Sequence, residues 1–332
     1  MIKSTNTEKF KRFFNNTSDG KTFCDITLES RNFLYQVALY CIDNNLGNLV
    51  AATKILEHYK DCLVRDTILL PDDILKIIKG YTDVDIKIFS TYGAFAALKS
   101  DGSVVTWGDE KFGGDSSDVQ NELKEGVETI YSNKFAFAAL KRDGSVVTWG
   151  SPNRGGDSST VQNALKEGVK TIFSAESAFA ALKSDGSVVT WGDDYWGGDS
   201  SKVQNALKEG VETIYSSPVV FAALKDNGSV VTWGDPKWGG DSSKVQDKLK
   251  GVKTIYSTDK SFAALKDDGS VVTWGDPFRG GDSSAVQNAL KEGVKTIYSN
   301  EYAFAALKRD GSVVTWGDPF RGGDSSKVQD KL

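Results

Sequence analysis

A repeated segment of about 42 residues constrains the fold of this chain more than any other feature. The dipeptide Trp-Gly recurs in steps of 42, 42, 42, 41 and 42 residues, at Trp107, Trp149, Trp191, Trp233, Trp274 and Trp316. Each copy reads close to Phe-Ala-Ala-Leu-Lys-x-Asp-Gly-Ser-Val-Val-Thr-Trp-Gly and continues, after a short loop, into Gly-Gly-Asp-Ser-Ser-x-Val-Gln. A fixed period of this length is the signature of a repeat architecture. We therefore expect residues 83–332 to form an array of six units and residues 1–82 to form a separate domain.

The second copy predicts a three-stranded meander. Short β-rich runs cover residues 127–132, 137–141 and 145–149. Asp143-Gly144 stands between the last two runs, and this dipeptide favours a two-residue type I′ hairpin because both central positions need a positive φ. One copy carries Asn227 in place of the Asp, and Asn also tolerates the left-handed region.

A different pattern follows the third strand. Ser117 and Gln120 have the spacing of a capping box, which predicts the start of a helix. Val119 and Leu123 then fall on one helical face, and Gly126 stands where a C-terminal glycine would end the helix. We expect each unit to close with a helix of about two turns.

Three-stranded sheets are too small to be stable alone and must pack on one another. Radial closure is the usual arrangement for repeats of this length, and the Trp of each copy would supply a large buried area. The sequence therefore predicts an all-β propeller of six repeats, each with three strands and a short helix. A small all-α segment over residues 1–82 would precede it.

The segment Ala-Leu-Lys-x-Asp-Gly-Ser-Val-Val-Thr-Trp-Gly resembles the core of the regulator of chromosome condensation (RCC-type) repeat family. Members of that family are β-propellers, commonly with seven blades. The compact three-stranded unit is most similar to its bacterial branch, which includes β-lactamase inhibitor protein II. The resemblance covers residues 83–332 and implies an RCC-like β-propeller.

The chain also departs from the family pattern. The Gly and His that usually precede the Ala-Leu pair are Asn300 and Ala303 in the last copy, and the family's Gly-Gln-Leu-Gly reads Gly-Gly-Asp-Ser at 322–325. The eukaryotic exchange factor of the family acts on the small GTPase Ran through a loop wedge, and the even spacing here leaves no room for one. A small-GTPase regulator of the guanine nucleotide exchange type therefore stays an alternative only.

Composition argues against several classes of function. Forty Lys and Arg stand against 45 Asp and Glu, a formal charge of −5, which argues against nucleic acid as a partner. Residues 83–332 contain no His or Cys with which to build a common catalytic or metal site, so we expect no enzyme activity, no cofactor and no metal. No apolar run reaches the length of a membrane span, so membrane insertion is not expected.

Cys24, Cys41 and Cys62 are an odd set without a signal-peptide core before them. This pattern favours reduced thiols and a cytoplasmic location. His58 is the one candidate partner for a catalytic thiol, and its position within a helical pattern favours a structural role.

Two windows vary among the copies, and both should lie on one edge because the first and third strands of a meander end on the same side. The first window is the turn after the first strand, at residues 91–94, 133–136, 175–178, 217–220, 258–261 and 300–303. The second is the loop after the third strand, at residues 109–112, 151–154, 193–196, 235–238, 276–279 and 318–321.

Aromatic and Arg side chains dominate interface hot spots, and the two windows contain many of them. The candidate partner-binding residues are Tyr92, Phe112, Phe135, Arg154, Tyr195, Trp196, Trp238, Phe278, Arg279, Tyr302, Phe320 and Arg321. The alternative interpretation is that these side chains only pack loops against neighbouring blades.

Residues 1–82 show several apolar stripes at helical spacing. Thr5 and Glu8 could form a capping box, and residues 70–74 resemble the opening of an F-box. The segment is thus either a helical cap on the propeller or part of an adaptor or ubiquitin-ligase component.

The leading functional hypothesis is a non-enzymatic scaffold that binds a protein partner through the variable-loop face of the propeller. The near-identity of the copies indicates recent duplication, as in effectors that intracellular bacteria deliver to a host. An effector role in the host cytoplasm is therefore a further expectation.

Overall fold

The computed structural model describes residues 86–331. The chain divides into two units, Met1–Asp85 and Ile86–Leu332. The predictions for the first unit fall outside the described residues: its helices, the F-box-like segment at 70–74, the three cysteines and His58. Within 86–331, no helix has the length and apolar character needed to cross a membrane.

The second unit consists of six three-stranded antiparallel sheets, each with its strands in sequence order. The strands are β1 Lys87–Ser90, β2 Ala94–Leu98, β3 Val104–Gly108, β4 Val127–Ser132, β5 Ala136–Lys141, β6 Val146–Gly150, β7 Val169–Ser174, β8 Ala178–Lys183, β9 Val188–Gly192, β10 Val211–Ser216, β11 Val220–Lys225, β12 Val230–Gly234, β13 Val252–Ser257, β14 Ser261–Lys266, β15 Val271–Gly275, β16 Val294–Ser299, β17 Ala303–Lys308 and β18 Val313–Gly317. The predicted six-fold array of three-stranded meanders is confirmed.

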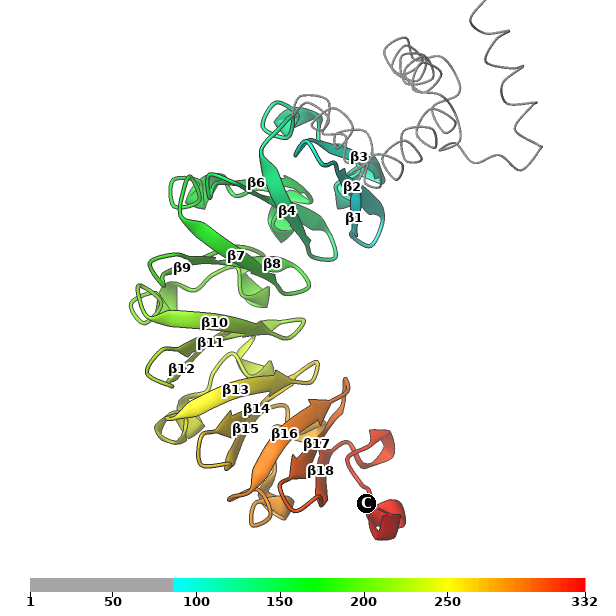
Figure 1. Ribbon diagram of the computed structural model, residues 1–332, viewed down its shortest axis with the longest axis vertical. Helices are drawn as coiled ribbons and strands as arrows, with labels where there is room; N and C mark the ends of the chain where they lie inside the picture. Colours follow the sequence, from blue (N-terminus) through cyan, green and yellow to red (C-terminus); the bar gives the residue numbers. More distant parts are fainter. Residues whose placement is uncertain (1–85, 332) are drawn as a thin grey trace, which may run out of the picture. The chain divides into compact units, whose positions relative to one another are not determined.

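Both faces of each sheet are apolar, because strand side chains alternate between the two sides. In the second sheet, Phe137 and Ala139 point to the side that meets the preceding sheet, while Ala138 and Leu140 point to the following one. All four side chains are at most 4% exposed. The sheets therefore stack in sequence order, and each of the four inner sheets is packed between its two neighbours (Figure 1).

One contact recurs at each of the five junctions between sheets. The Phe of the middle strand stacks on the Trp of the third strand, as in Phe137 and Trp149 with ring centroids 5.1 Å apart. The Trp Nε1–H donates to a glycine carbonyl in the loop of the preceding repeat at 3.0–3.1 Å. Buried indole N–H groups need such an acceptor, so this bond sets the register of one sheet on the next.

The glycine that accepts this bond is required by its conformation and by its position. Gly155 has φ +100°, which favours glycine. A Cβ added there would lie 2.6 Å from Phe179 Cδ2. In the first five repeats, the first glycine of the Gly-Gly pair thus allows a loop to lie directly on the aromatic pair of the next sheet.

The turn between the second and third strands differs from the predicted two-residue type I′ turn. Lys141 N–H donates to the Ser145 carbonyl, and Gly144 N–H donates to the Lys141 carbonyl, both at 2.9 Å. This is the pattern of a three-residue loop that ends in a left-handed glycine, and Gly144 has φ +79°. The Asp143 carboxylate accepts from the Ser145 N–H and hydroxyl and holds the loop closed.

A short helix follows each third strand as predicted, but the capping box does not form, and the helix is of the 3₁₀ type, with one turn in four units and about two turns in the others. These helices are η4 Ser117–Val119, η6 Ser159–Val161, η8 Ser201–Val203, η10 Ser243–Lys248, η12 Ser284–Val286 and η14 Ser326–Lys331. Asp157 accepts from the Ser159 N–H at 2.8 Å, which is the donor that the Gln162 side chain would take in a capping box. The Gln162 N–H donates to the Ser159 carbonyl at 3.4 Å. The Gln162 side chain bonds Ser158 Oγ and lies near the Val146 carbonyl, which ties the turn to the third strand.

A second 3₁₀ helix lies in the loop after each third strand. These are η3 Glu110–Phe112, η5 Pro152–Arg154, η7 Asp194–Trp196, η9 Pro236–Trp238, η11 Pro277–Arg279 and η13 Pro319–Arg321. Each ends at the first glycine of the Gly-Gly pair, in the left-handed conformation.

The outer faces of the first and sixth sheets are exposed. Trp107 is 44% exposed, whereas its five counterparts are 3–5% exposed. Closure of the six sheets into a propeller ring therefore stays a prediction, while the stacked array itself is observed.

The steric role of the junction glycine can be measured with a pair of matched substitutions. Gly280 and Gly322 lie in identical segments, Asp-Pro-Phe-Arg-Gly-Gly-Asp-Ser-Ser, with φ +96° and +104°. A Cβ at Gly280 would lie 2.6 Å from Phe304 Cδ2, while one at Gly322 would meet only Asn300 Nδ2, at 3.3 Å. We expect G280A to lower the free energy of unfolding by about 1–3 kcal/mol more than G322A, because overpacking adds to a shared backbone strain.

Urea unfolding followed by far-UV circular dichroism, in dilute protein, measures this difference. Equal losses in the two variants would show that backbone strain alone accounts for the glycine.

Candidate functional site

The two variable windows of each repeat lie side by side, as the strand connectivity predicts. The Asn133 side chain donates to the Arg154 carbonyl at 2.7 Å, and Asn300 does the same to Arg321 at 2.9 Å. In other repeats a threonine makes this bond, as from Thr258 to the Arg279 carbonyl at 3.1 Å. We call the edge formed by these turns and loops the variable rim.

Backbone hydrogen bonds join the variable rim from one sheet to the next. Tyr92 N–H donates to the Lys134 carbonyl at 3.0 Å, Lys134 N–H to Glu176 at 3.2 Å, and Glu176 N–H to Pro218 at 2.8 Å. The side chains at these turns are therefore held at fixed positions relative to one another.

The loops after the third strands are held just as firmly. The Asp at the start of η9, Asp235, accepts from the Lys237 N–H at 2.9 Å, and most other repeats make the equivalent bond. In the first five repeats, the other end of the loop carries the glycine that contacts the next sheet. A hydrogen bond to Asp235 also raises the pKa of Tyr195 in the neighbouring loop.

Part of the variable rim is an aromatic cluster on the first two sheets. Phe112 lies 5.5 Å from Tyr92 and 5.6 Å from Phe135 between ring centroids. The Arg154 guanidinium lies 3.9 Å from the Phe135 ring centroid. The Lys134 ammonium lies 5.6 Å from the Tyr92 ring centroid and 5.9 Å from the Phe135 ring centroid, and it pairs with a Glu176 carboxylate oxygen at 2.9 Å.

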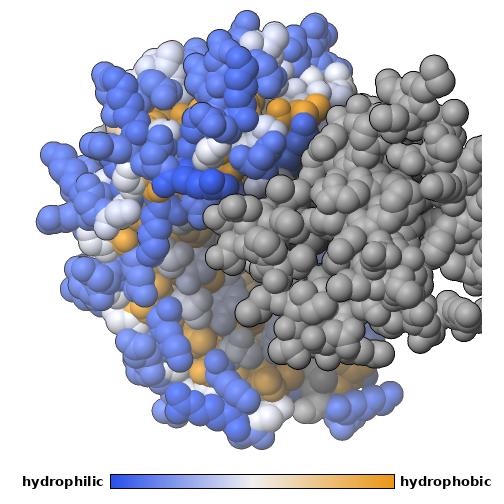
Figure 2. Space-filling model, turned by 45° about the horizontal axis from the view of Figure 1, so that its top comes forward, coloured by the Kyte–Doolittle hydropathy of each residue, from blue (hydrophilic) through white to orange (hydrophobic). Residues whose placement is uncertain are grey.

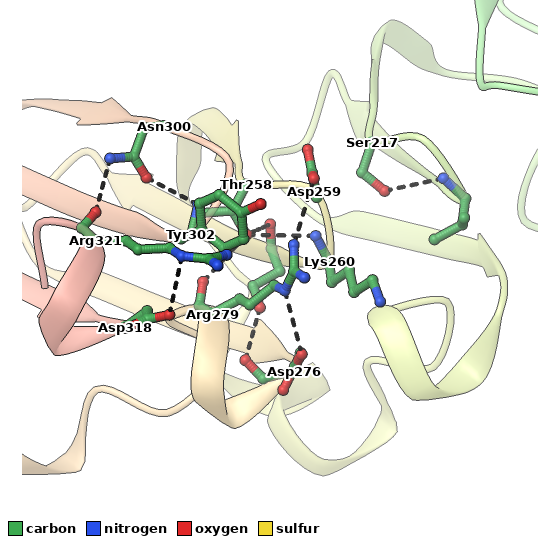
Figure 3. A network of polar contacts seen from close by, with 12 residues as sticks. Ser217, Thr258, Asp259, Lys260, Asp276, Arg279, Asn300, Tyr302, Asp318 and Arg321 are labelled. Carbon is green, nitrogen blue, oxygen red and sulfur yellow. Dashed lines mark hydrogen bonds and ion pairs between the residues drawn. The ribbon is translucent and has the colours of Figure 1, made fainter. Parts of the chain in front are cut away.

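A second cluster on the last sheets is built from alternating charge and aromatic rings. Tyr302 lies between two guanidinium groups, at 4.5 Å from Arg279 and 3.9 Å from Arg321 (Figure 3). Arg279 also lies 3.4 Å from Asp259 and 3.8 Å from Asp276. Carboxylates on one side and a ring on the other thus fix the planes of the guanidinium groups.

The two tryptophans of the variable rim are less free than the sequence suggests. Both are half-buried: Trp196 packs against the cores on either side of the fourth sheet, and Trp238 against the core between the fourth and fifth sheets. The Lys260 ammonium lies 3.8 Å from the Trp238 ring centroid. Each tryptophan therefore combines a packing contact with an exposed edge.

Four of the candidate residues are more than half exposed. Phe320 is 96% exposed, Phe278 83%, Tyr92 74% and Tyr195 57%. Figure 2 shows a face of the array that is mainly hydrophilic, with apolar residues in small patches between hydrophilic ones. The twelve candidate residues thus form two packed groups and several single projecting side chains, instead of one continuous patch.

Lys134, Lys260 and Asp259 belong to the same edge, and we did not predict them. They lie in the variable windows but carry no aromatic ring or guanidinium, and each contacts a residue of another repeat or another window. A count of charges within the windows would have pointed to them.

An open polar hollow of about 540 Å³ lies along the turns of the last four sheets. Glu176, Asp259 and Glu301 contribute carboxylates, and the rest of the lining is mostly serine, with one threonine and one asparagine. Burial and the nearby Glu301 raise the pKa of Asp259 above its ordinary value of 3.8, and Arg279 opposes this shift. In residues 86–331, no three His, Cys, Asp or Glu side chains gather closely enough to hold a metal ion.

The invariant Asp-Gly turns lie on the opposite edge and have a structural role. Hydrogen bonds from the Ser145 side chain and N–H lower the pKa of Asp143 below 3.8, and the same holds for the equivalent aspartates. Asn227 makes the same two bonds to Ser229, at 3.0 and 2.7 Å.

No family model and no curated protein matches the chain. Among solved structures, yeast RCC1 (Prp20), crystallised with Kap60, is similar at 17% identity, with a TM-score of 0.42 over 72% of this chain and 71% of that chain. Human WBSCR16 is similar at 16% identity, with a TM-score of 0.44 over 72% and 78%. The ectodomain of the Physcomitrella patens receptor kinase CR4 is similar at 17% identity, with a TM-score of 0.40 over 69% and 60%.

These scores are too low to assign the chain to a family. The resemblance to RCC-type repeats therefore stays a prediction from the motif, and so does its bacterial branch.

The raised pKa of Asp259 predicts a pH-dependent effect on stability. Because the protonated carboxyl is favoured in the folded state, ionisation at neutral pH lowers the free energy of unfolding. Asp259→Asn should therefore raise the unfolding free energy at neutral pH, and the gain should disappear as the pH falls through the raised pKa towards 3.8.

Urea unfolding at a series of pH values measures this gain. Asp143→Asn is the matched control, because its carboxyl has a lowered pKa and the variant should show no gain at neutral pH. A gain for Asp259→Asn that is constant with pH would contradict the argument.

Proposed function

We propose that residues 86–332 form a non-enzymatic scaffold that binds a protein partner through the variable rim. The main support for this proposal is that the repeats differ mainly at this edge, while the remaining positions are nearly the same in every copy. The shared residues pack sheets together or close turns, so variation at the rim changes what is displayed without changing the fold.

The chemistry of the variable rim supports a protein partner. Projecting rings such as Phe278 and Phe320 have little contact with their own array, yet they stand on loops fixed by capping bonds to Asp276 and Asp318. Rigid aromatic side chains lose little conformational entropy on binding and are typical anchors in interfaces.

The charge pattern adds selectivity to these anchors. Arg279, Arg321 and Lys260 are held by rings and carboxylates, and Glu176, Asp259 and Glu301 line the hollow beside them. Both signs lie within one edge, so a partner would need matching charges of both signs. Such a mixed pattern favours a folded protein surface over a polyanion such as nucleic acid.

A capture experiment with matched variants tests the proposal. The double variant Phe278→Ser/Phe320→Ser removes two rings that are 83% and 96% exposed, so the array should remain folded. The control, Arg142→Ser/Arg309→Ser, changes two exposed residues on the opposite edge. We expect partners retained by the wild type and the control to be depleted at least about tenfold with the rim variant, equivalent to about 1.4 kcal/mol or more.

Quantitative mass spectrometry of the retained proteins gives the readout, and unchanged circular dichroism shows that the variants are folded. Retention of the same set by all three proteins would overturn the role of the rim.

A further inference from the structure

The two ends of the array present the two halves of the contact that joins the sheets inside it. We call the outer side of the first sheet, with Ile88, Phe95, Val105 and Trp107, the leading face. The outer side of the sixth sheet, with Tyr298, Ala305, Leu307, Val313 and the Gly322 loop, is the trailing face. Both are made of the residue types that are buried at the five internal junctions.

The leading face is fully formed but exposed. The Phe95 and Trp107 rings are stacked with centroids 5.4 Å apart, as in the buried pairs. Yet Phe95 is 45% exposed and Ile88 62%, whereas their equivalents Phe137 and Ile130 are 0% and 3% exposed. Within residues 86–331, no glycine carbonyl accepts from Trp107 Nε1, although the other five tryptophans each have one.

The trailing face shows the complementary gaps. Leu307 and Val313 are half-buried, while their equivalents Leu140 and Val146 are 4% and 1% exposed. A Cβ at Gly322 would meet only Asn300 Nδ2, whereas the equivalent glycines lie against the Phe of the next sheet. Gly311 has no atom within 4 Å of its Cβ position, whereas the same turn at Gly144 touches the following repeat.

We propose that the trailing face of one chain binds the leading face of a second copy of the same chain, head to tail. The two faces are complementary in the way seen at the five internal junctions, where Ala, Leu, Val and the glycine loop of one sheet meet Ile, Phe and Trp of the next. The docked pair would reproduce this junction, with Gly322 carbonyl accepting from Trp107 Nε1.

Repeat arrays usually carry polar residues on their terminal faces, because exposed apolar ends associate. Here both ends keep the internal apolar pattern. The contact is heterologous, since two different surfaces meet, so each added copy leaves one leading and one trailing face open. Association should therefore continue beyond a dimer as concentration rises.

A hydrogen bond between Tyr and Thr side chains at an internal junction suggests a variant that should disrupt only the proposed contact between chains. Tyr256 OH lies 3.2 Å from Thr296 Oγ1 across a junction, and Tyr298 occupies the Tyr position on the trailing face. Lys87 occupies the Thr position on the leading face. Tyr298→Lys would therefore place two like charges at the proposed contact.

Sedimentation velocity on the full chain, over about a hundredfold range of concentration, tests the proposal. The wild type should form a series of species that grows with concentration. Ile88→Lys and Tyr298→Lys change side chains that are 62% and 63% exposed and should each weaken association at least about tenfold. Phe320→Lys, at a residue 96% exposed on the variable rim, is the control and should associate like the wild type.

Mixing the two end variants gives the decisive result. Tyr298→Lys keeps an intact leading face and Ile88→Lys keeps an intact trailing face, so the mixture should form a one-to-one dimer and nothing larger. If either variant fails to fold, Val105→Lys and Gly322→Ala replace them as variants of the leading and trailing faces.

Three outcomes would overturn the proposal. In the first, the wild type stays monomeric at every concentration, which would mean that the end faces are covered within one chain. In the second, both end variants associate as strongly as the wild type. In the third, the mixture of the two end variants gives no dimer.

Discussion

The contact of a tryptophan indole with a glycine carbonyl of the preceding repeat is the interaction on which the rest of the structure depends. It fixes where each sheet lies on its neighbour, since the N–H has a single acceptor at 3.0–3.1 Å. It also explains why glycine must stand there, because a Cβ would overlap the stacked Phe. Removal of either partner would leave a buried polar group without a hydrogen bond, which costs about 1–3 kcal/mol.

The same loop connects the core to the variable rim. Its glycine lies on the next sheet, and the 3₁₀ turn just before it carries residues such as Phe278 and Arg279. Packing therefore fixes the end of the loop, while the sequence of the turn stays free to vary. The array can therefore display different side chains at constant positions. Because the end of each loop is fixed, the loops keep nearly the same length, and the copies keep a nearly constant spacing.

The sequence predicts most of the strand pattern because the signals are local. Alternating apolar residues and the Asp-Gly dipeptide, or Asn-Gly in the fourth copy, place all six meanders, with strand ends within one residue of those predicted for the second unit. The predicted capping box fails because Asp157, one of six equivalent aspartates, accepts from the Ser159 N–H in place of the Gln162 side chain. The grouping of the rim side chains depends on contacts between repeats, such as Lys260 with Trp238, and these are not encoded in the pattern of any single copy.

An array whose junctions are all alike has no internal signal for its own length. Each unit specifies how the next one docks, and that rule applies equally to the last unit, so the sixth sheet offers the same surface as the first five. Closure into a ring would bury the leading and trailing faces of one chain against each other. Docking of a second chain would instead bury the trailing face of one chain and the leading face of the other. Both outcomes use the same two surfaces, so they compete. The cost of bringing two chains together opposes docking, and the strain of bending the stack opposes closure. The number of units and the turn taken at each junction therefore decide between a closed ring and an open array whose ends can bind one another.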